Sequence, residues 1–189
     1  MVRLFFASFT NARARELLAR KTRWLKQQLP GGIKWVDPDN FHITLKFLGE
    51  VGEDEASELR EKIEKEELDL EDFSYKYQGL ETFPHVNNPR VIVTPVELGG
   101  EKIKEVHNFI ENICTDMGFE AETRSFKPHL TLGRVKDDDL KDEVSSFFSE
   151  LEDPYVVNVL DHMEKFSLME SNLTPDGPEY MEVFSKKLQ

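Results

Sequence analysis

The sequence contains one short motif twice, first as Phe41-His42-Ile43-Thr44-Leu45-Lys46-Phe47-Leu48-Gly49 and again as Pro128-His129-Leu130-Thr131-Leu132-Gly133-Arg134-Val135. Both copies contain His-(Ile/Leu)-Thr-Leu, and the two histidines stand 87 positions apart (129 minus 42), close to half of the 189 residues. Two His-x-Thr triplets are expected by chance in roughly 2–3% of sequences of this composition. The repeat therefore predicts a chain built from two similar halves.

Each copy of the motif alternates polar and apolar residues, which is typical of a β-strand. Side chains two positions apart lie on the same face of a strand. His42 and Thr44 therefore face one way, while the aliphatic residues that alternate with them face the core, and His129 and Thr131 form the same pair in the second copy. If a pseudo-twofold axis relates the halves, two imidazoles and two hydroxyls line one cleft.

Outward from the motif strands, His42–Leu48 and His129–Val135, the pattern predicts further strands and helices. The expected strands are Arg3–Phe9, Phe73–Phe83, Arg90–Val96, Tyr155–Leu160, Lys165–Met169 and Tyr180–Lys187. The expected helices are Asn11–Gln28, ended by Pro30-Gly31-Gly32, then Glu53–Glu67, Glu101–Met117 and one within Lys136–Leu151, with a loop over Pro84–Pro89. Both halves thus follow the order β-α-β-α-β.

Length and composition predict a globular protein with a sizeable core, because 14 Phe and 2 Trp supply large apolar area. The net charge of −13 makes the chain a poor match to duplex DNA, whose binding neutralises many phosphates. No apolar run is long enough for a transmembrane helix and no signal peptide is recognisable, so we expect a cytoplasmic location. The single cysteine, Cys114, excludes an intrachain disulfide and is expected in the core.

Two histidines on one cleft suit acid–base chemistry at phosphorus. An imidazole has an ordinary pKa of about 6.5, so one ring can activate the attacking oxygen while the other protonates the leaving oxygen. Threonine hydroxyls can donate hydrogen bonds to the phosphoryl oxygens. This chemistry uses no metal and no covalent nucleophile, so we expect no cofactor. The alternatives are purely structural histidines, and a metal site that lacks a carboxylate or cysteine at ligand spacing.

The sequence resembles the two-histidine (2H) phosphoesterase superfamily, and most closely the RNA 2′,3′-cyclic phosphodiesterases once called 2′-5′ RNA ligases. Beyond the two motifs, the similar stretches are Arg3–Ala7, Arg124–Val135, Ser167–Ser171 and Gly177–Tyr180. The resemblance covers essentially the whole chain and implies one domain over residues 1–189, made of two interleaved similar lobes. The implied fold is α/β of the α+β type and bilobal, with two pseudo-twofold-related antiparallel sheets and outer helices flanking a central cleft.

The same resemblance implies metal-independent hydrolysis of RNA 2′,3′-cyclic phosphate ends to 2′-phosphomonoesters. His42 would donate a proton to the departing 3′-oxygen, His129 would accept one from water, and Thr44 and Thr131 would hold the phosphate. The expected partners are RNA ends or nucleotides that carry a 2′,3′-cyclic phosphate, with no membrane and no duplex DNA, and the chain is expected to be a monomer. The reverse reaction, 2′-5′ ligation, belongs to the same chemistry.

Two other functions are compatible with these motifs. One is a non-catalytic module that binds RNA ends or nucleotides in the same cleft. The other is a 2H phosphodiesterase that acts on a different cyclic or 2′-5′ substrate. Turnover in the presence of EDTA separates an enzyme from a binding module, and analysis of the products separates the two enzymes.

The arginines beside the second motif are the candidate cations for the substrate phosphate. We expect Arg124 and Arg134 to contact it, since a guanidinium can hold a phosphate bidentately. Strict alternation, however, puts Arg134 on the face opposite His129, and it puts Lys46 on the face of His42.

Four other aromatic or histidine residues are expected to have structural or surface positions and no role in catalysis. Phe126 is expected to be a core residue, with base stacking as the alternative. His85 is expected in a plain surface loop, and His107 and His162 are expected to face solvent.

Overall fold

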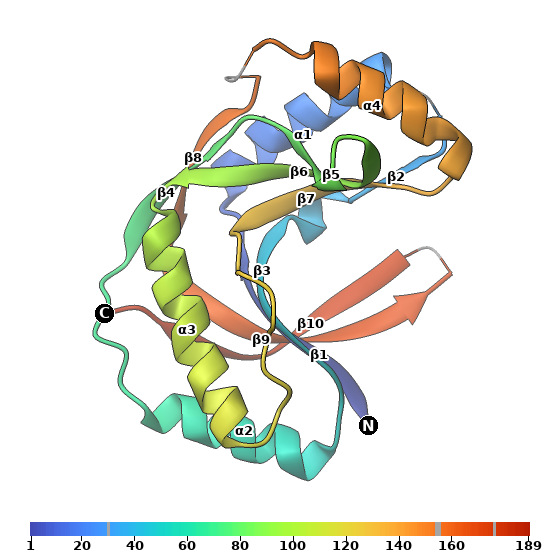
Figure 1. The fold of residues 1–189 in the computed structure, drawn as a ribbon. Helices are drawn as coiled ribbons and strands as arrows, with labels where there is room; N and C mark the ends of the chain where they lie inside the picture. The colour runs from blue at the N-terminus through green and yellow to red at the C-terminus, as the bar shows by residue number, and fades with distance from the viewer. Residues whose placement is uncertain (30, 154–155, 176) are drawn as a thin grey trace.

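The computed structural model describes residues 1–29, 31–153, 156–175 and 177–189, and within these ranges ten strands form one antiparallel sheet (Figure 1). The strands are β1 (Val2–Phe9), β2 (Ile33–Trp35), β3 (His42–Val51), β4 (Phe73–Gln78), β5 (Glu81–His85), β6 (Asn88–Leu98), β7 (His129–Val135), β8 (Asn158–Met163), β9 (Lys165–Thr174) and β10 (Gly177–Lys187). Their order is β10-β9-β1-β3-β7-β6-β4-β8, with β2 paired to β7 and β5 paired to β6.

The helices of the described residues lie outside this sheet. They are α1 (Ala12–Gln28), α2 (Glu53–Lys65), α3 (Gly100–Asp116) and α4 (Lys141–Glu150), with short 3-10 turns η1 (Pro38–Asn40) and η2 (Asp138–Leu140). In Figure 1, α1 and α4 cover the upper half of the molecule and α2 and α3 cover the lower half. This arrangement confirms the predicted fold class, and none of the helices described is long and apolar enough to cross a membrane.

The two halves of the sheet meet where β3 touches β7, through the single antiparallel pair Ile43 and Leu130. Directly opposite residues of an antiparallel pair face the same side of a sheet. Both side chains are fully buried, so this side is the core. The neighbours on either side of the pair, His42 and Thr44 on β3 and the histidine and threonine of β7, therefore point away from the core.

Polar contacts tie the first helix to the far edge of the sheet. The Asn11 side chain caps α1 by accepting a hydrogen bond from the Ala14 backbone N–H at 2.9 Å. Its backbone and side-chain N–H groups donate to the buried carboxylate of Asp161 on β8, which also accepts from the Tyr75 hydroxyl. A helix from the start of the chain is thereby fixed to a strand near its end.

Two of the predicted elements were wrong and one was missed. The expected strand Phe73–Phe83 is two strands, because Gly79 adopts a left-handed φ of 79° between β4 and β5. The expected loop Pro84–Pro89 is the paired end of the β5–β6 hairpin. The missed element is β2, a strand of three residues. The starting residue expected for β8, Tyr155, and the helix stop Pro30 lie outside the described residues.

The prediction for the cysteine is confirmed. Cys114 is fully buried in the main core, on the inner face of α3. Burial raises the pKa of its thiol to about 12, so the sulfur is a packing group and not a nucleophile.

Candidate active site

The two copies of the motif share a backbone irregularity as well as the same side chains. In the pairing of β1 with β3, Phe6 opposes Lys46 and Ala7 opposes Thr44, so Leu45 is an extra residue on β3. In the pairing of β6 with β7, Ile92 opposes Gly133 and Val93 opposes Thr131, so Leu132 is likewise extra. Each strand thus carries a β-bulge three residues after its histidine.

The bulges reverse the side-chain alternation that follows them. Arg134 returns to the face of His129 and Thr131, and Lys46 turns toward the core, so both expectations from strict alternation were wrong. Phe47, the counterpart of Arg134 in the first copy, is 66% exposed. The positive charge of Arg134 lowers the pKa of both His42 and His129, so this guanidinium acts electrostatically on both rings.

Lys46 has a structural role. Its ammonium, nearly inaccessible to solvent, donates to a Glu111 carboxylate oxygen at 2.7 Å and to the Glu120 carbonyl at 3.0 Å. The other carboxylate oxygen of Glu111 accepts from the Glu122 backbone N–H at 2.8 Å. These bonds fasten β3, through α3, to the segment that leads from α3 to β7.

A second contact holds the same segment, and here the prediction for His107 was wrong. His107 is buried, and its Nδ1 donates to the Leu45 carbonyl at 2.7 Å. Its ring stacks on Phe126 with centroids 4.0 Å apart and planes 9° apart. Phe126 packs against the core, as expected, and the stack positions the chain three residues before His129. His85 is exposed, also as expected, and His162 is half-buried between Ser74 and Asp72.

His42 is held by hydrogen bonds on both ring nitrogens. Its Nδ1 donates to the Asn40 carbonyl at 2.8 Å. In the neutral ring, Nε2 then accepts a hydrogen bond from the Thr44 hydroxyl, 3.1 Å away. The Asn40 side chain also donates to the Pro178 carbonyl at 3.2 Å, so one residue fixes both the His42 tautomer and the start of β10.

Three aromatic rings enclose the His42 imidazole. The ring centroids of Phe5, Phe9 and Tyr180 lie 5.3, 5.0 and 5.4 Å from it, and Tyr180 stands nearly perpendicular at 87°. They come from β1 and β10, the two ends of the chain. His42 is therefore the more enclosed of the two motif histidines.

His129 has the same tautomer in a more open setting. Its Nδ1 donates to the Lys127 carbonyl at 2.7 Å, and its one aromatic neighbour among the described residues is Phe83, with ring centroids 4.8 Å apart. Nε2 of His129 has no hydrogen-bond partner among the residues that the structure describes. It is the nitrogen available to a substrate.

Burial controls the charge of both histidines. It lowers the pKa of His42 to about 4, against the opposing effect of the Asn40 carbonyl. Burial also lowers the pKa of His129, and there the hydrogen bond to the Lys127 carbonyl and the negative charge of Glu81 act in the opposite direction. Both rings are consequently neutral at pH 7 in the free protein.

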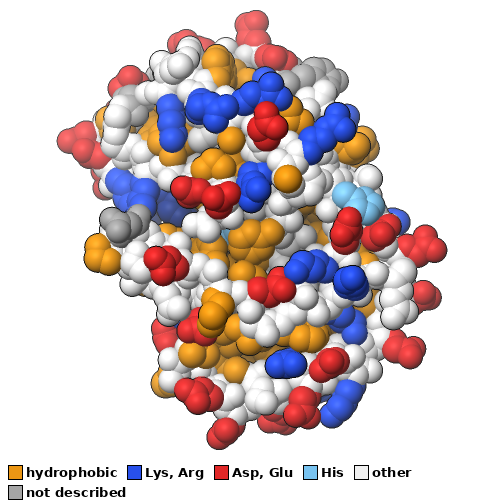
Figure 2. All heavy atoms as spheres, turned by 180° about the vertical axis from the view of Figure 1, so that it is seen from behind, with side chains coloured by type: hydrophobic (Ala, Val, Ile, Leu, Met, Phe, Trp, Pro, Cys, Tyr) orange, Lys and Arg blue, Asp and Glu red, His pale blue; other side chains and the backbone are white. Residues whose placement is uncertain are grey.

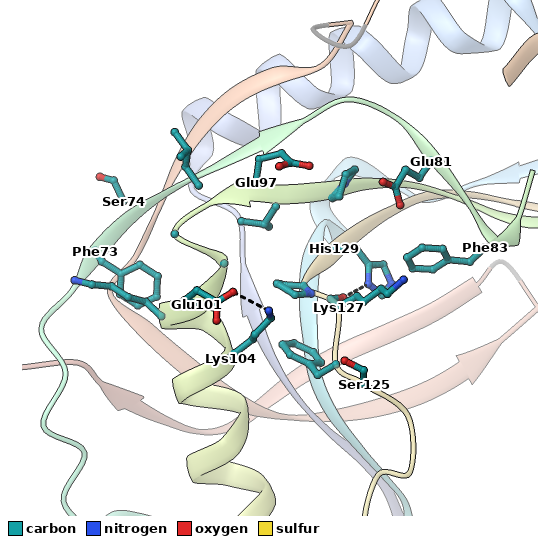
Figure 3. A pocket seen from close by; sticks show the side chains of 18 of the residues that line it. Phe73, Ser74, Glu81, Phe83, Glu97, Glu101, Lys104, Ser125, Lys127 and His129 are labelled. Carbon is teal, nitrogen blue, oxygen red and sulfur yellow. Dashed lines mark hydrogen bonds and ion pairs between the residues drawn. The ribbon is translucent and has the colours of Figure 1, made fainter. Parts of the chain in front are cut away.

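Two cavities meet at His129. The larger, about 1310 Å³, is also lined by Thr44, Thr131, Phe47 and Arg134. The smaller, about 740 Å³, extends from His129 and Phe83 toward the start of α3 (Figure 3). His129 borders both cavities and His42 borders neither.

The structure brings most of the predicted site residues together on one face, but it places Arg124 farther away. His42, Thr44, His129, Thr131 and Arg134 share one face of the joined strands. Arg124 lies farther along the larger cavity, on the exposed segment that precedes β7. Within the described part of the chain, no three His, Cys, Asp or Glu residues form a cluster that could hold a metal ion.

A family model described as LigT like phosphoesterase matches the chain twice, over residues 10–93 and 93–180. The chain belongs to this family. The two consecutive matches divide it between the two motifs, in agreement with the repeat of the bulged strand.

Individual relatives support this assignment. A protein of Archaeoglobus fulgidus named RNA 2′,3′-cyclic phosphodiesterase is 34% identical over 190 residues, 96% of this chain and 98% of the relative. One of Aeropyrum pernix with the same name is 34% identical over 155 residues, 82% of this chain and 86% of the relative. The crystal structure of E. coli LigT complexed with 3′-AMP has a TM-score of 0.79 at 22% identity, over 99% of this chain and 98% of the other, and shows the shared fold.

Sequence reasoning missed several residues of the LigT-like site. Asn40, Tyr180 and the two phenylalanines of β1 surround His42, and the sequence pattern does not predict that they contact it. Phe47 was detectable only as an exposed aromatic residue, and its exposure depends on the bulge at Leu45.

Proposed function

We propose that this protein hydrolyses RNA 2′,3′-cyclic phosphate ends to 2′-phosphomonoesters, with His42 and His129 as its acid–base pair. The observation that carries the proposal is the joint between β3 and β7. There, two copies of one bulged strand present two imidazoles of the same tautomer, and the charge of Arg134 acts on both. The names of the relatives supply the substrate class.

His129 is the proton acceptor in this proposal. Its position at the junction of the two cavities gives water access to it, whereas His42 lies behind its aromatic neighbours. Because Nδ1–H is committed to the Lys127 carbonyl, Nε2 carries the lone pair of the neutral ring. That lone pair takes a proton from water as its oxygen attacks phosphorus.

His42 is the proton donor, and it becomes protonated when the substrate binds. With a pKa of about 4, His42 carries no proton at neutral pH in the free protein. A bound phosphate anion favours the imidazolium and raises this pKa. The rings of Phe5, Phe9 and Tyr180 offer the imidazolium cation–π contacts. The proton then passes to the departing 3′-oxygen, opposite the attacking water.

The remaining residues hold the phosphate. The hydroxyls of Thr44 and Thr131 flank the two histidines on the same face and donate to the phosphoryl oxygens. Arg134 neutralises the charge that develops on those oxygens, and its planar fork suits bidentate binding. Arg124, farther along the larger cavity, contacts a more distant part of the RNA.

Turnover of a nucleoside 2′,3′-cyclic phosphate in EDTA tests this function. Replacing either His42 or His129 by Ala should lower the rate roughly 10²–10⁴-fold. His85→Ala, at an exposed hairpin position, is the matched control and should retain wild-type activity. Less than a tenfold loss in both site variants would exclude the acid–base pair. Micromolar binding of the cyclic nucleotide without turnover would instead identify a non-catalytic binding module.

The smaller cavity favours a second activity, 2′-5′ ligation. An alcohol that replaces water must approach phosphorus from the side of His129, and this cavity opens there (Figure 3). Proton transfer from a 5′-hydroxyl to His129, attack on phosphorus and protonation of O3′ by His42 would yield a 2′-5′ diester. Mixing a cyclic-phosphate donor with a 5′-hydroxyl acceptor and assaying for the diester tests this activity.

We also propose that residues 1–189 act as one domain and as a monomer. The half-sheet around His42 contains β1, β9 and β10 from both ends of the chain, and the half around His129 comes from its middle. Because both histidines and Arg134 belong to one copy of the chain, the chemistry needs no residue from a partner.

A further inference from the structure

Positive charge is concentrated on α1. Six of its 17 residues are basic and one, Glu16, is acidic. The whole chain has 24 basic and 37 acidic residues, so the rest carries 18 and 36, respectively (24 minus 6 and 37 minus 1). Figure 2, a view from behind, shows Lys and Arg side chains gathered across the upper part of the molecule, where α1 lies. The basic residues of α1 are Arg13, Arg15, Arg20, Lys21, Arg23 and Lys26.

The outer face of α1 differs from an ordinary solvated helix. On α2, six acidic residues alternate with three basic ones, so opposite charges are interspersed. On α1, only Arg15 makes an ion pair with a described residue. Arg13, Arg20 and Trp24 follow at spacings of seven and four, which places them on one stripe, and Trp24 is 36% exposed within it.

This face begins next to the candidate active site. Arg15 pairs with Asp39 at 3.1 Å. The next residue, Asn40, accepts the hydrogen bond from Nδ1 of His42. From that point the 17 residues of α1 extend about 25 Å across the protein.

We propose that the outer face of α1 binds the phosphate backbone of the RNA strand upstream of its cyclic-phosphate end. This inference rests on the proposed function and adds that the natural substrate is an RNA strand several nucleotides long. Arginines without an ion-pair partner among the described residues, beside a tryptophan that is 36% exposed and contacts Phe147 of α4 on one side, provide the phosphate contacts and the stacking surface that single strands use. The remainder of the chain, with 36 acidic and 18 basic residues, repels RNA outside the α1 face and the cavity that holds Arg124.

The test compares two substrates and two double variants. Arg20→Gln/Arg23→Gln removes two charges from the face, and Arg60→Gln/Lys65→Gln removes two from α2 as a matched control. For each variant, kcat/KM is measured on a cyclic mononucleotide and on a ten-nucleotide RNA with a 2′,3′-cyclic phosphate end, between 50 and 300 mM salt. The α1 variant should lower the ratio of RNA to mononucleotide kcat/KM about tenfold. Its log–log salt slope for the RNA should be shallower by about 1.4, or 0.7 for each lost contact.

Two results would overturn the α1 proposal. One is an unchanged ratio in the α1 variant, and the other is an equal fall in the α2 control, which would reflect net charge alone. If the wild-type protein turns over neither substrate, the proposed function fails, but fluorescence anisotropy with a labelled ten-nucleotide RNA still tests the α1 face. In that assay, equal binding by the wild type and the α1 variant would again exclude it, and would leave an acidic protein as the partner to examine.

Discussion

His42 and His129 occupy equivalent positions on two copies of one bulged strand, yet their surroundings differ. Three aromatic rings enclose His42, while His129 has one aromatic neighbour and lies at the junction of two cavities. The repeat accounts for the matching tautomers and the shared face. The difference arises from elements outside it, β1 and β10 on one side and the β5–β6 hairpin on the other. In our account, this difference assigns the donor and acceptor roles.

After the histidines themselves, the largest effect should come from the position five residues after each of them. Arg134 and Phe47 are counterparts after the two bulges, but Arg134 carries a positive charge that acts on both rings, whereas Phe47 carries none. Arg134→Gln should lower kcat/KM about 100-fold, because a charge-assisted pair of hydrogen bonds to the phosphate is lost. Phe47→Leu is the comparison variant and should cost less than tenfold. Equal losses in steady-state assays would show that Arg134 has no special role.

The pH profile should reveal the low pKa values of the free protein. The reaction needs one histidine protonated and the other neutral. This singly protonated state is most populated between the two pKa values, which are properties of the coupled pair and not of either residue alone. Since burial lowers the pKa of His42 to about 4 and that of His129 below its ordinary value, both limbs of the kcat/KM profile shift to acid. We expect kcat/KM to fall about tenfold per pH unit above roughly pH 6.5. The kcat optimum should lie at higher pH, because bound phosphate raises both pKa values. A kcat/KM optimum above pH 7.5 would contradict this.

Removing one ring should make His42 more like His129. Tyr180→Leu opens the enclosure to water, so the pKa of His42 should rise toward 6.5, and kcat should fall about tenfold as the imidazolium loses a cation–π contact. Tyr180→Phe keeps the ring and is the matched control. Titration of the His42 ring by NMR measures the shift without any assay of activity. An unchanged His42 pKa in the leucine variant would show that the ring does not control its charge.

The smallest effect concerns stability. Lys46→Met leaves Glu111, a mostly buried carboxylate, without its ammonium partner and should cost about 2 kcal/mol of unfolding free energy. Lys65→Met removes an exposed pair with Glu61 and should cost less than about 0.5 kcal/mol. Urea denaturation measures both. Similar costs would mean that the Lys46 network contributes no more than a surface ion pair.

The sequence was sufficient for the features that depend on local pattern. The histidine–threonine pairs, the face they share and the helices around them follow from alternation and helical spacing. The bulges at Leu45 and Leu132 were not detectable, since each leucine fits an ordinary alternating strand. That is why the orientations of Lys46 and Arg134 could not be predicted.

Tertiary contacts account for the other failures. His107 lies on a charged stretch of sequence, and only the packing of α3 against β3 explains why it is buried. The aromatic enclosure of His42 joins residues from opposite ends of the chain, for which a single sequence carries no signal.

The most direct test of the central claim is a crystal structure with a bound nucleoside 2′-phosphate, the expected product. We expect Nε2 of His42 and Nε2 of His129 both to lie about 2.6–3.2 Å from oxygens of the same phosphate, on opposite sides of phosphorus. A phosphate that contacts one imidazole while the other points to a separate surface would contradict it.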